Sequence, residues 1–398
     1  MPASPSTARV INDRLALSLL EREGPLTAGQ LKTLTGLSRP SVADLVERLQ
    51  DSGLVTVVGE SGAARRGPNA KVYGIVADRV HLAALDVRTT GVTAVVTDLL
   101  GVHLAEASVP MADEIGTAPA VDRAVRLLER TARKAGPPPL HCVGIGAPGL
   151  IDPATGELRD TTGLPAWHRR LVGALQQRGQ ARIIVENETN LAALAEQRDG
   201  AARGRDSFVL LWLGHGIGAA LVLDGRLRRG ASGGAGEIGF LPVPGTAAAP
   251  PATLCDGGFH SLAASAAIVE LGAAHGLTPP PGPEPRGAAV VARAVAAGED
   301  RFLDALAERL AVGVAAVAAV LDPGCVVLGG ETGLAGGPEL AARVARRLGA
   351  MSPLATDVRS GELGGSAVLR GALLTARDAA QDDLFGSVPA LSMGGAVR

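Results

Sequence analysis

The chain has 398 residues and a nearly balanced charge, with 38 Lys and Arg against 40 Asp and Glu, so it is long enough for two or three hydrophobic cores. Residues 1–80 carry ten basic and eight acidic side chains, an excess too small to indicate a nucleic-acid partner by itself. No segment reaches the roughly 18 apolar residues of a membrane span, and the first residues lack a secretion-signal pattern. We therefore expect a cytoplasmic protein without a membrane partner.

The three cysteines, Cys142, Cys255 and Cys325, are too few and too scattered for a disulfide framework. Cys142 and Cys325 lie in apolar runs, which predicts buried thiols. This cysteine usage agrees with a reducing compartment.

The first predicted element is a helix over residues 10–23, which a Gly-Pro pair ends. Its apolar spacing places Ile11, Leu15, Leu19 and Leu20 on the inward side. Residues 1–8 are expected to form a loose tip.

Residues 27–50 predict two helices joined by a tight turn. Thr27 and Ser38 are natural N-caps, and Gly36 fits the turn between the helices. Pro40 lies in the first turn of the second helix, where its missing N–H is harmless. A further pair of strands, separated by a basic loop, completes the pattern of a winged helix-turn-helix.

The second of these helices is apolar on one side and polar on the other. Val42, Leu45, Val46 and Leu49 form the apolar stripe. A capped helix with one polar face is what the DNA major groove accepts, so double-stranded DNA is the predicted partner. Arg39 could merely solvate the helix start, but its position there favours a base or phosphate contact. The predicted DNA contacts in this helix are Ser38, Arg39, Ser41, Asp44 and Arg48.

The loop over residues 59–71 places Arg65 and Arg66 beside glycines in a hairpin tip. Arginines on such an arm suit a phosphate pair or the narrow minor groove. A solvated hairpin tip is the simpler alternative, and the preceding helix-turn-helix favours the DNA contact.

After the wing, strands alternate with helices in two similar halves, which predicts a mixed α/β body with a cleft between two lobes. The predicted domains are residues 1–77 for the DNA-binding head, 78–200 for lobe 1, 201–384 for lobe 2 and 385–398 for a flexible tail. The principal predicted strands and helices cover residues 81–87, 92–99, 102–108, 121–135, 141–145, 208–213, 218–223, 301–321 and 325–328.

Six motifs occur in the order typical of the ROK family of repressors, open reading frames and sugar kinases, and the chain resembles this family over nearly its whole length. The resemblance implies an actin-like, sugar-kinase-like body of two α/β lobes with sugar bound in the cleft, preceded in the repressors by a winged helix. The motifs are Leu85-Asp-Val-Arg-Thr-Thr-Gly91, Gly144-Ile-Gly-Ala-Pro-Gly149, Val185-Glu-Asn-Glu-Thr-Asn190, Leu213-Gly-His-Gly-Ile-Gly218, Gly236-Glu-Ile-Gly-Phe240 and Val327-Leu-Gly-Gly330.

The loops that hold ATP phosphates in the family's kinases are altered here. The first loop keeps Asp86 but has Arg88, which fills space meant for phosphate although its charge could attract an anion. The second loop keeps Gly214 and Gly216 but has His215 where the kinases have Thr. Glu331 adds negative charge beside the adenosine-side loop. Phosphate binding needs backbone N–H groups and hydroxyl donors, so we expect no nucleotide cofactor.

Glu188 stands at the position of the family's catalytic Asp. Its carboxylate lies about one bond length further out, and a misplacement of ~1 Å can cost on the order of a hundredfold in rate. Together with the altered phosphate loops, this predicts a pseudokinase without catalytic residues.

The family's structural zinc site is also incomplete. Phe240 replaces its His, and only Cys255 and His260 remain near its cysteine cluster. Because one thiolate and one imidazole do not complete a tetrahedral set, no metal is expected there.

Sugar recognition is partly kept, since Asn187, Glu188 and Glu237 align with sugar ligands of the family. Gly163 and the pair Ser261-Leu262 replace others, and lost polar partners weaken specificity. The alternative for the surviving polar side chains is helix capping and packing between the lobes.

The sequence therefore predicts a transcriptional regulator, a repressor of carbohydrate-related genes, that forms a homodimer or homotetramer and senses a sugar-like effector. One alternative is an ATP-dependent sugar kinase with an appended DNA-binding domain, which Asp86 and the glycine turns keep open. Another is a constitutive regulator whose body serves only for oligomerisation.

Overall fold

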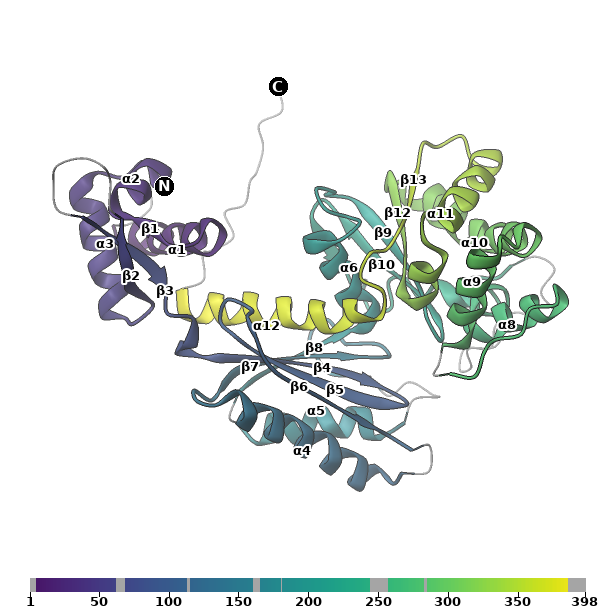
Figure 1. The fold of residues 1–398 in the computed structure, drawn as a ribbon, viewed down its shortest axis with the longest axis horizontal. Helices are drawn as coiled ribbons and strands as arrows, with labels where there is room; N and C mark the ends of the chain where they lie inside the picture. Colours follow the sequence, from purple (N-terminus) through teal and green to yellow (C-terminus); the bar gives the residue numbers. More distant parts are fainter. Residues whose placement is uncertain are drawn as a thin grey trace.

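The computed structural model describes residues 5–61, 69–112, 115–159, 165–179, 181–243, 257–282 and 285–385. Figure 1 shows a head and two α/β lobes, joined by one long C-terminal helix. Among the described residues, no helix has both the length and the apolar content needed to cross a bilayer.

The head is a winged helix-turn-helix, as predicted. The capping residues act as expected: Thr27 forms a capping box with Gln30, the Ser38 side chain accepts from the Ser41 N–H, and Gly36 ends its helix at φ 70°. Its strands pair in the order β1-β3-β2. The elements are α1 (Pro5–Glu23), β1 (Leu26–Thr27), α2 (Ala28–Thr35), α3 (Arg39–Asp51), β2 (Val55–Ser61) and β3 (Ala70–Ile75).

The predicted apolar stripe of α3 is confirmed, with all four of its residues buried. In α1 the prediction was partly wrong, because the helix begins at Pro5 and Leu15 is 39% exposed. Ala16 and Leu17 are buried instead, beside Leu19 and Leu20. Helix α1 packs against α2, α3 and the C-terminal helix. Leu15 is exposed because it does not lie on the side of α1 that these helices cover.

Lobe 1 is a five-stranded sheet in the order β6-β5-β4-β7-β8, with β4, β7 and β8 parallel. Helices α4 and α5 pack below this sheet in Figure 1, and α12 packs above it. A short 3-10 turn, η1 (Ala77–Arg79), leads from the head into β4. The elements are β4 (His81–Arg88), β5 (Gly91–Asp98), β6 (His103–Pro110), α4 (Thr117–Ala135), β7 (Leu140–Ala147), α5 (Trp167–Gln177) and β8 (Arg182–Asn187).

Lobe 2 is a second five-stranded sheet in the order β11-β10-β9-β12-β13. Every residue of β9 is buried, because α6 covers one face of the sheet while the opposite face packs into the core that contains α10 and α11. The elements, with the preceding α6, are α6 (Glu188–Asp199), β9 (Phe208–Leu213), β10 (Ile217–Leu223), β11 (Arg226–Arg228), η2 (Ile238–Phe240), α7 (His260–Ala263), α8 (Ser265–Ala274), α9 (Arg286–Ala297), α10 (Asp300–Leu321), β12 (Cys325–Gly329), α11 (Gly330–Met351), β13 (Asp357–Ser360) and η3 (Gly364–Ser366).

The last helix, α12 (Ala367–Phe385), follows lobe 2 in sequence but packs on β4, β7 and α6. The assignment of residues 367–384 to lobe 2 was therefore wrong, and Phe385, predicted to start a flexible tail, is a buried helical residue. Residues 386–398 lie outside the described part of the chain. No element after residue 328 was predicted from the sequence, so neither this helix nor the sheet on which it packs was expected.

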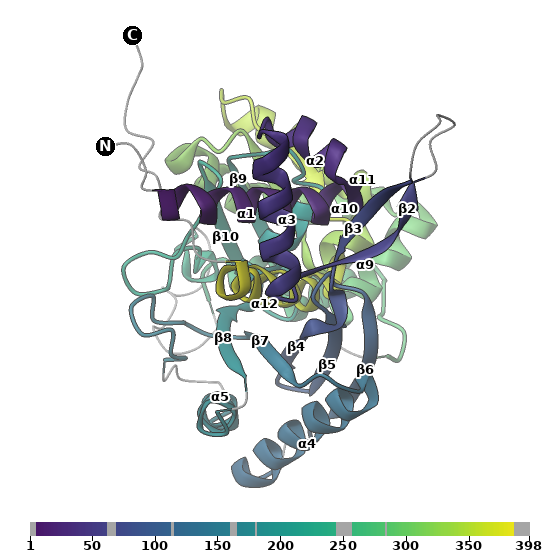
Figure 2. The ribbon, with the colours of Figure 1, turned by 90° about the vertical axis from the view of Figure 1, so that its left-hand side faces the viewer.

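Helix α12 also holds the head. Its C-terminal half shares a hydrophobic core with α1 and α3, and Arg14 of α1 lies 2.5 Å from Asp382. A second ion pair joins Glu21 and Arg377 at 3.6 Å. In Figure 2, which views the molecule from the side of the head, α12 is seen end-on behind the helices of the head, of which α1 contacts it. The head is thus packed on the body rather than tethered by its linker alone.

The chain passes between the lobes in two segments, and both segments contact one buried carboxylate. Glu196 of α6 is 1% exposed and accepts backbone N–H bonds from Ala201, Glu362 and Leu363, at 2.8, 2.9 and 2.9 Å. These donors belong to the segment entering lobe 2 and the segment leaving it. Glu196 therefore ties both crossing segments to the end of α6.

We expect Glu196→Ala to lower the free energy of unfolding by about 2–4 kcal/mol, because three buried N–H groups lose their acceptor. Equilibrium urea unfolding followed by the fluorescence of Trp167 in lobe 1 and Trp212 in lobe 2 measures this. Glu270→Ala, at an exposed position of α8, is the matched control and should change the value by less than about 0.5 kcal/mol. Equal unfolding midpoints for the two variants would contradict a structural role of Glu196.

Candidate functional site

The start of α3 presents an exposed cation. Arg39 is exposed at the first position of the helix, and in the part of the chain that the structure describes it has no ion-pair partner. Ser38 and Ser41 are occupied with each other, since their hydroxyl oxygens lie 2.8 Å apart and Ser38 also caps the helix. Asp44 is exposed one turn further along. This face offers a guanidinium donor and a carboxylate acceptor, the groups that read guanine and cytosine edges.

Arg48, predicted to contact DNA, is paired within the head. Its Nη2 and Nε atoms donate to the two carboxylate oxygens of Asp13, at 2.6 and 3.4 Å. This two-point contact fixes α3 against α1. A DNA contact by Arg48 stays a prediction. The predicted contacts Arg65 and Arg66 lie outside the described residues.

The first phosphate loop is filled by its own arginine. Arg88 Nε donates to Asp86 Oδ2 at 2.8 Å within lobe 1, and Arg88 Nη1 donates to Glu331 Oε1 at 2.7 Å in lobe 2. Its remaining amino group donates to the carbonyl of Gly365 at 3.0 Å, just before α12. One guanidinium therefore spans the cleft and satisfies an acceptor from each lobe and from the start of the connecting helix.

Charge explains this arrangement. Burial alone would lower the pKa of Arg88, but the Asp86 and Glu331 carboxylates raise it above its usual range, so the guanidinium stays charged. Glu331, expected to repel a nucleotide, is instead the partner of Arg88. The two departures from the kinase pattern thus complement each other electrostatically.

The second loop is also shaped by neighbours. A Cβ at Gly214 would lie 2.7 Å from the Trp212 Nε1 atom, so the indole leaves room for glycine only. His215 is exposed at the tip, and its carbonyl accepts from the Ser265 N–H at 3.2 Å. The carbonyl of Gly216 accepts from the Gly214 N–H at 3.2 Å. The loop provides a tight turn without the hydroxyl donor of the kinases.

The cleft gathers several carboxylates around Arg88. Burial, followed by the nearby Asp86 carboxylate, raises the pKa of Glu188 to about 7. Glu237 is exposed to the cleft and also contributes to that rise, while desolvation raises its own pKa. Asp86 Oδ1 is buried and has no hydrogen-bond partner among the described residues. These oxygens are acceptors that ligand hydroxyl groups can satisfy.

Asn187, a predicted effector ligand, is largely committed to the fold. Its Oδ1 accepts from the Thr189 and Asn190 N–H groups at 2.8 and 3.4 Å, which caps α6. Its Nδ2 donates to the Gly149 carbonyl at 3.0 Å. One amide hydrogen is left for a ligand, so the capping alternative accounts for most of this residue's contacts.

Aromatic packing occupies the region of the family's zinc site. Phe240 packs edge-on against His260, with ring centroids 5.6 Å apart at 88°. Ser261, near a replaced sugar ligand, donates its hydroxyl to the Gly258 carbonyl at 2.7 Å. Gly163 and Cys255 lie outside the described residues.

Sequence reasoning missed His168 at the start of α5. Its ring is buried against Trp167, with centroids 4.1 Å apart, and burial lowers its pKa to about 4 while the Arg88 backbone partly opposes that shift. The buried imidazole is therefore neutral, and its pKa responds to the Arg88 backbone of the first loop. The only signal in the sequence was its place beside a tryptophan.

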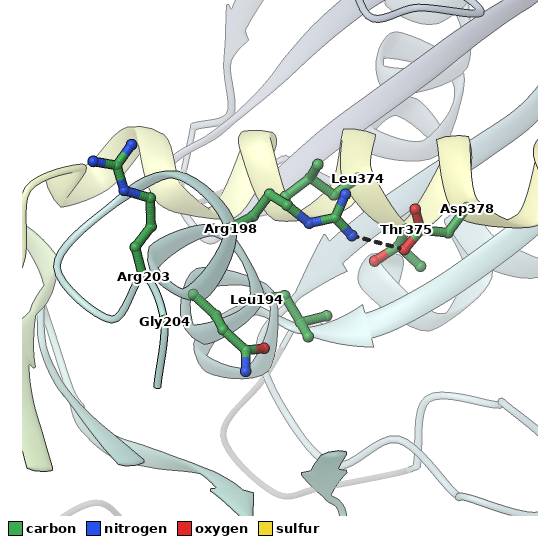
Figure 3. Close-up of a pocket in the computed structure, with 8 residues that line it drawn as sticks. Leu194, Arg198, Arg203, Gly204, Leu374, Thr375 and Asp378 are labelled. Atoms are coloured by element: carbon green, nitrogen blue, oxygen red, sulfur yellow. Dashed lines mark hydrogen bonds and ion pairs between the residues drawn. The ribbon is translucent and has the colours of Figure 1, made fainter. Parts of the chain in front are cut away.

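A separate pocket of about 330 Å³ lies between α6 and α12, outside the cleft (Figure 3). Arg198 and Asp378 meet across it at 3.5 Å. Leu194 and Leu374 provide apolar lining between the two helices. At this pocket α6 and α12 do not pack closely against each other.

Comparison with known proteins places this geometry in a family. A xylose repressor of Bacillus subtilis is 26% identical over 252 residues, which cover 61% of this chain and 62% of the repressor, so the alignment spans about three fifths of that relative. A ROK hexokinase of Thermus thermophilus shares the body, with 29% identity, a TM-score of 0.61, and coverage of 76% of this chain and all of that one.

The whole architecture, head included, matches a solved structure. A ROK family transcriptional regulator, described as a homologue of the E. coli MLC protein, has 20% identity and a TM-score of 0.75, with 96% of this chain and 98% of that chain covered. This likeness shows the fold. The MarR family model matches residues 12–67, and the ROK family model matches residues 82–379, well over half of the chain. The protein belongs to the ROK family.

Proposed function

We propose that this protein is a sequence-specific DNA-binding transcriptional regulator, a repressor of carbohydrate-related genes. The observation that carries the proposal is the exposed face of α3 on a winged head packed against a ROK body, where Arg39 has no ion-pair partner among the described residues. Relatives named as a xylose repressor and a ROK transcriptional regulator support it. Such a protein acts in the cytoplasm as a homodimer or homotetramer, whose paired heads read half-sites about one DNA turn apart, ~34 Å.

The body acts without catalysis in this proposal. Arg88 occupies the phosphate loop and pairs with Glu331, and the second loop lacks a hydroxyl donor. A nucleotide would have to displace both an ion pair and a hydrogen bond to Gly365 before its phosphates found partners. These contacts favour a pseudokinase over the sugar-kinase alternative.

A sugar-like effector is the proposed signal, recognised by Glu188, Glu237 and the free amide hydrogen of Asn187. Sugar hydroxyls donate to carboxylates, and the cleft presents acceptors without partners. Ligand-dependent lobe movement would reach the head through α12, which starts beside Gly365 and ends at Arg14 of α1. The effector acts only if it prefers one lobe arrangement, since equal affinity for both would shift nothing.

We expect Arg39→Ala to weaken operator binding about 10–100-fold, because a good base contact contributes about 1–3 kcal/mol. Genome-wide footprinting of the purified protein identifies the operator, and fluorescence anisotropy at fixed salt measures the affinity. Arg126→Ala, on the exposed side of α4, is the control and should bind like the wild type. The absence of any specific site at moderate salt would refute the regulator.

Magnesium-ATP should neither raise the melting temperature nor support phosphorylation of any sugar in a panel, because Arg88 fills the phosphate loop. Coupled ADP-release assays measure turnover, with a ROK hexokinase as positive control. Sugar-dependent ADP release that disappears in Glu188→Gln would restore the kinase alternative.

An effector sugar should raise the melting temperature of the wild type and change its affinity for the operator. Glu237→Gln should remove both responses, since the carboxylate acceptor becomes an amide. Glu157→Gln, at an exposed loop position, should retain them. If every sugar leaves operator binding unchanged, the body is an oligomerisation module and the effector proposal fails.

A further inference from the structure

Three side chains with metal-binding atoms meet where β7 lies beside the last turn of α12. A ring nitrogen of His141, the Cys142 sulfur and a carboxylate oxygen of Asp383 all lie within 4.8 Å of one another. They come from two segments more than 240 positions apart in the chain.

A β-bulge turns the two neighbouring residues of β7 toward the same place. In the pairing of β4 with β7, His81 faces Leu140 and Leu82 faces Cys142, so His141 is skipped. Adjacent residues of a regular strand point to opposite faces, and a bulge is the device that re-aims one of them. Cys142 is fully buried in the core shared with the head and α12.

The histidine and the aspartate each leave one atom directed at this cluster. His141 Nε2 is buried, makes no hydrogen bond, and lies 3.6 Å from Asp383 Oδ2. Asp383 uses its other oxygen, Oδ1, to accept from Arg182 Nη1 at 2.7 Å. A buried polar nitrogen without a hydrogen bond is unfavourable, and coordination of a cation is one way to satisfy it.

A groove of about 380 Å³ borders the cluster, and its lining includes His141, Arg182 and Asp383 but not the buried Cys142. A fourth ligand, such as a water molecule, would enter from this groove. Three protein ligands with one open position form a common arrangement for tetrahedral zinc.

We propose that His141, Cys142 and Asp383 bind a divalent metal ion of the zinc type. The nitrogen, sulfur and oxygen donors are those that zinc accepts in proteins, and thiolate plus carboxylate neutralise the charge of the ion. Arg182 then serves as the outer partner that orients Asp383. The proposal is independent of the regulatory function.

Binding requires the Cys142 thiol to release its proton to solvent. Because protons compete with the metal for the thiolate, affinity is expected to fall as the pH falls. The bound ion would link β7 to the turn of α12 that carries Asp382, the partner of Arg14 in the head.

Cobalt titration of the chelator-treated, full-length protein tests the proposal. One equivalent of Co²⁺ per chain should produce the near-ultraviolet absorption of a cobalt–thiolate bond, and Zn²⁺ should displace it. Cys142→Ala should abolish this absorption, whereas Cys325→Ser and Cys255→Ser should retain it.

The variants His141→Ala and Asp383→Asn test the site while keeping the buried Cys142. Each should weaken Co²⁺ binding at least tenfold while circular dichroism remains that of the wild type. Absence of the thiolate absorption in the wild type, its persistence in Cys142→Ala, or its loss in Cys255→Ser would overturn the site.

Discussion

The close packing of α12 between α6 and β7 is the constraint on which the rest of the molecule depends. A Cβ at Gly371 would lie 2.0 Å from the Leu191 carbonyl oxygen, and a Cβ at Gly144 would lie 2.2 Å from that of Ala372. Only glycine permits these approaches. Because α12 sits this deep, its start can meet Arg88 in the cleft and its end can share the core of the head. The same two glycines therefore position the ion pairs at both ends.

The cleft illustrates how paired substitutions differ from single ones. Arg88 without Glu331 would keep only Asp86 as an ion-pair partner in a half-buried loop, and Glu331 without Arg88 would place a carboxylate at a loop that approaches phosphate. Together they form a contact at 2.7 Å that spans the lobes, and Asp86 holds the other side of the guanidinium. An internal cation–anion pair thus takes the place where the kinases of the family are expected to hold an external anion. Cleft geometry then depends on this chain's own charges.

The head could be predicted from the sequence because its signals are local. Thr27, Ser38 and Gly36 specify helix ends within a few residues, and the stripe of α3 has helical period. The two lobes followed from strand and helix order together with the six motifs. Partners far apart in sequence could not be predicted. Arg48 meets Asp13 only because α1 crosses α3 at a particular position.

The same limit applies to the site. The residues Asp86, Arg88, Glu188 and Glu237 were identified individually, and the structure brings them into one electrostatic cluster. Their roles depend on burial and on Glu331, which lies 243 positions from Arg88. For Asn187 the sequence did offer the correct alternative, which was helix capping, and the contacts favour it. The skipped position of His141 in β7 has no sequence signature, because a bulge is visible only in the register of two paired strands.

In the proposed regulator, a signal passes mechanically from the cleft to the head through α12. Bending α12 would break the close contacts that its glycine packing allows. If lobe 2 moves relative to lobe 1, we therefore expect α12 either to stay in place or to move as one rigid helix. The buried Glu196 accepts hydrogen bonds from both crossing segments and so holds them together at the end of α6. Arg88 and Glu331 join the two lobes, and the same guanidinium donates to the carbonyl of Gly365, two residues before α12. In the proposed regulator, α12 is therefore the element through which an effector in the cleft would act on the DNA-binding head.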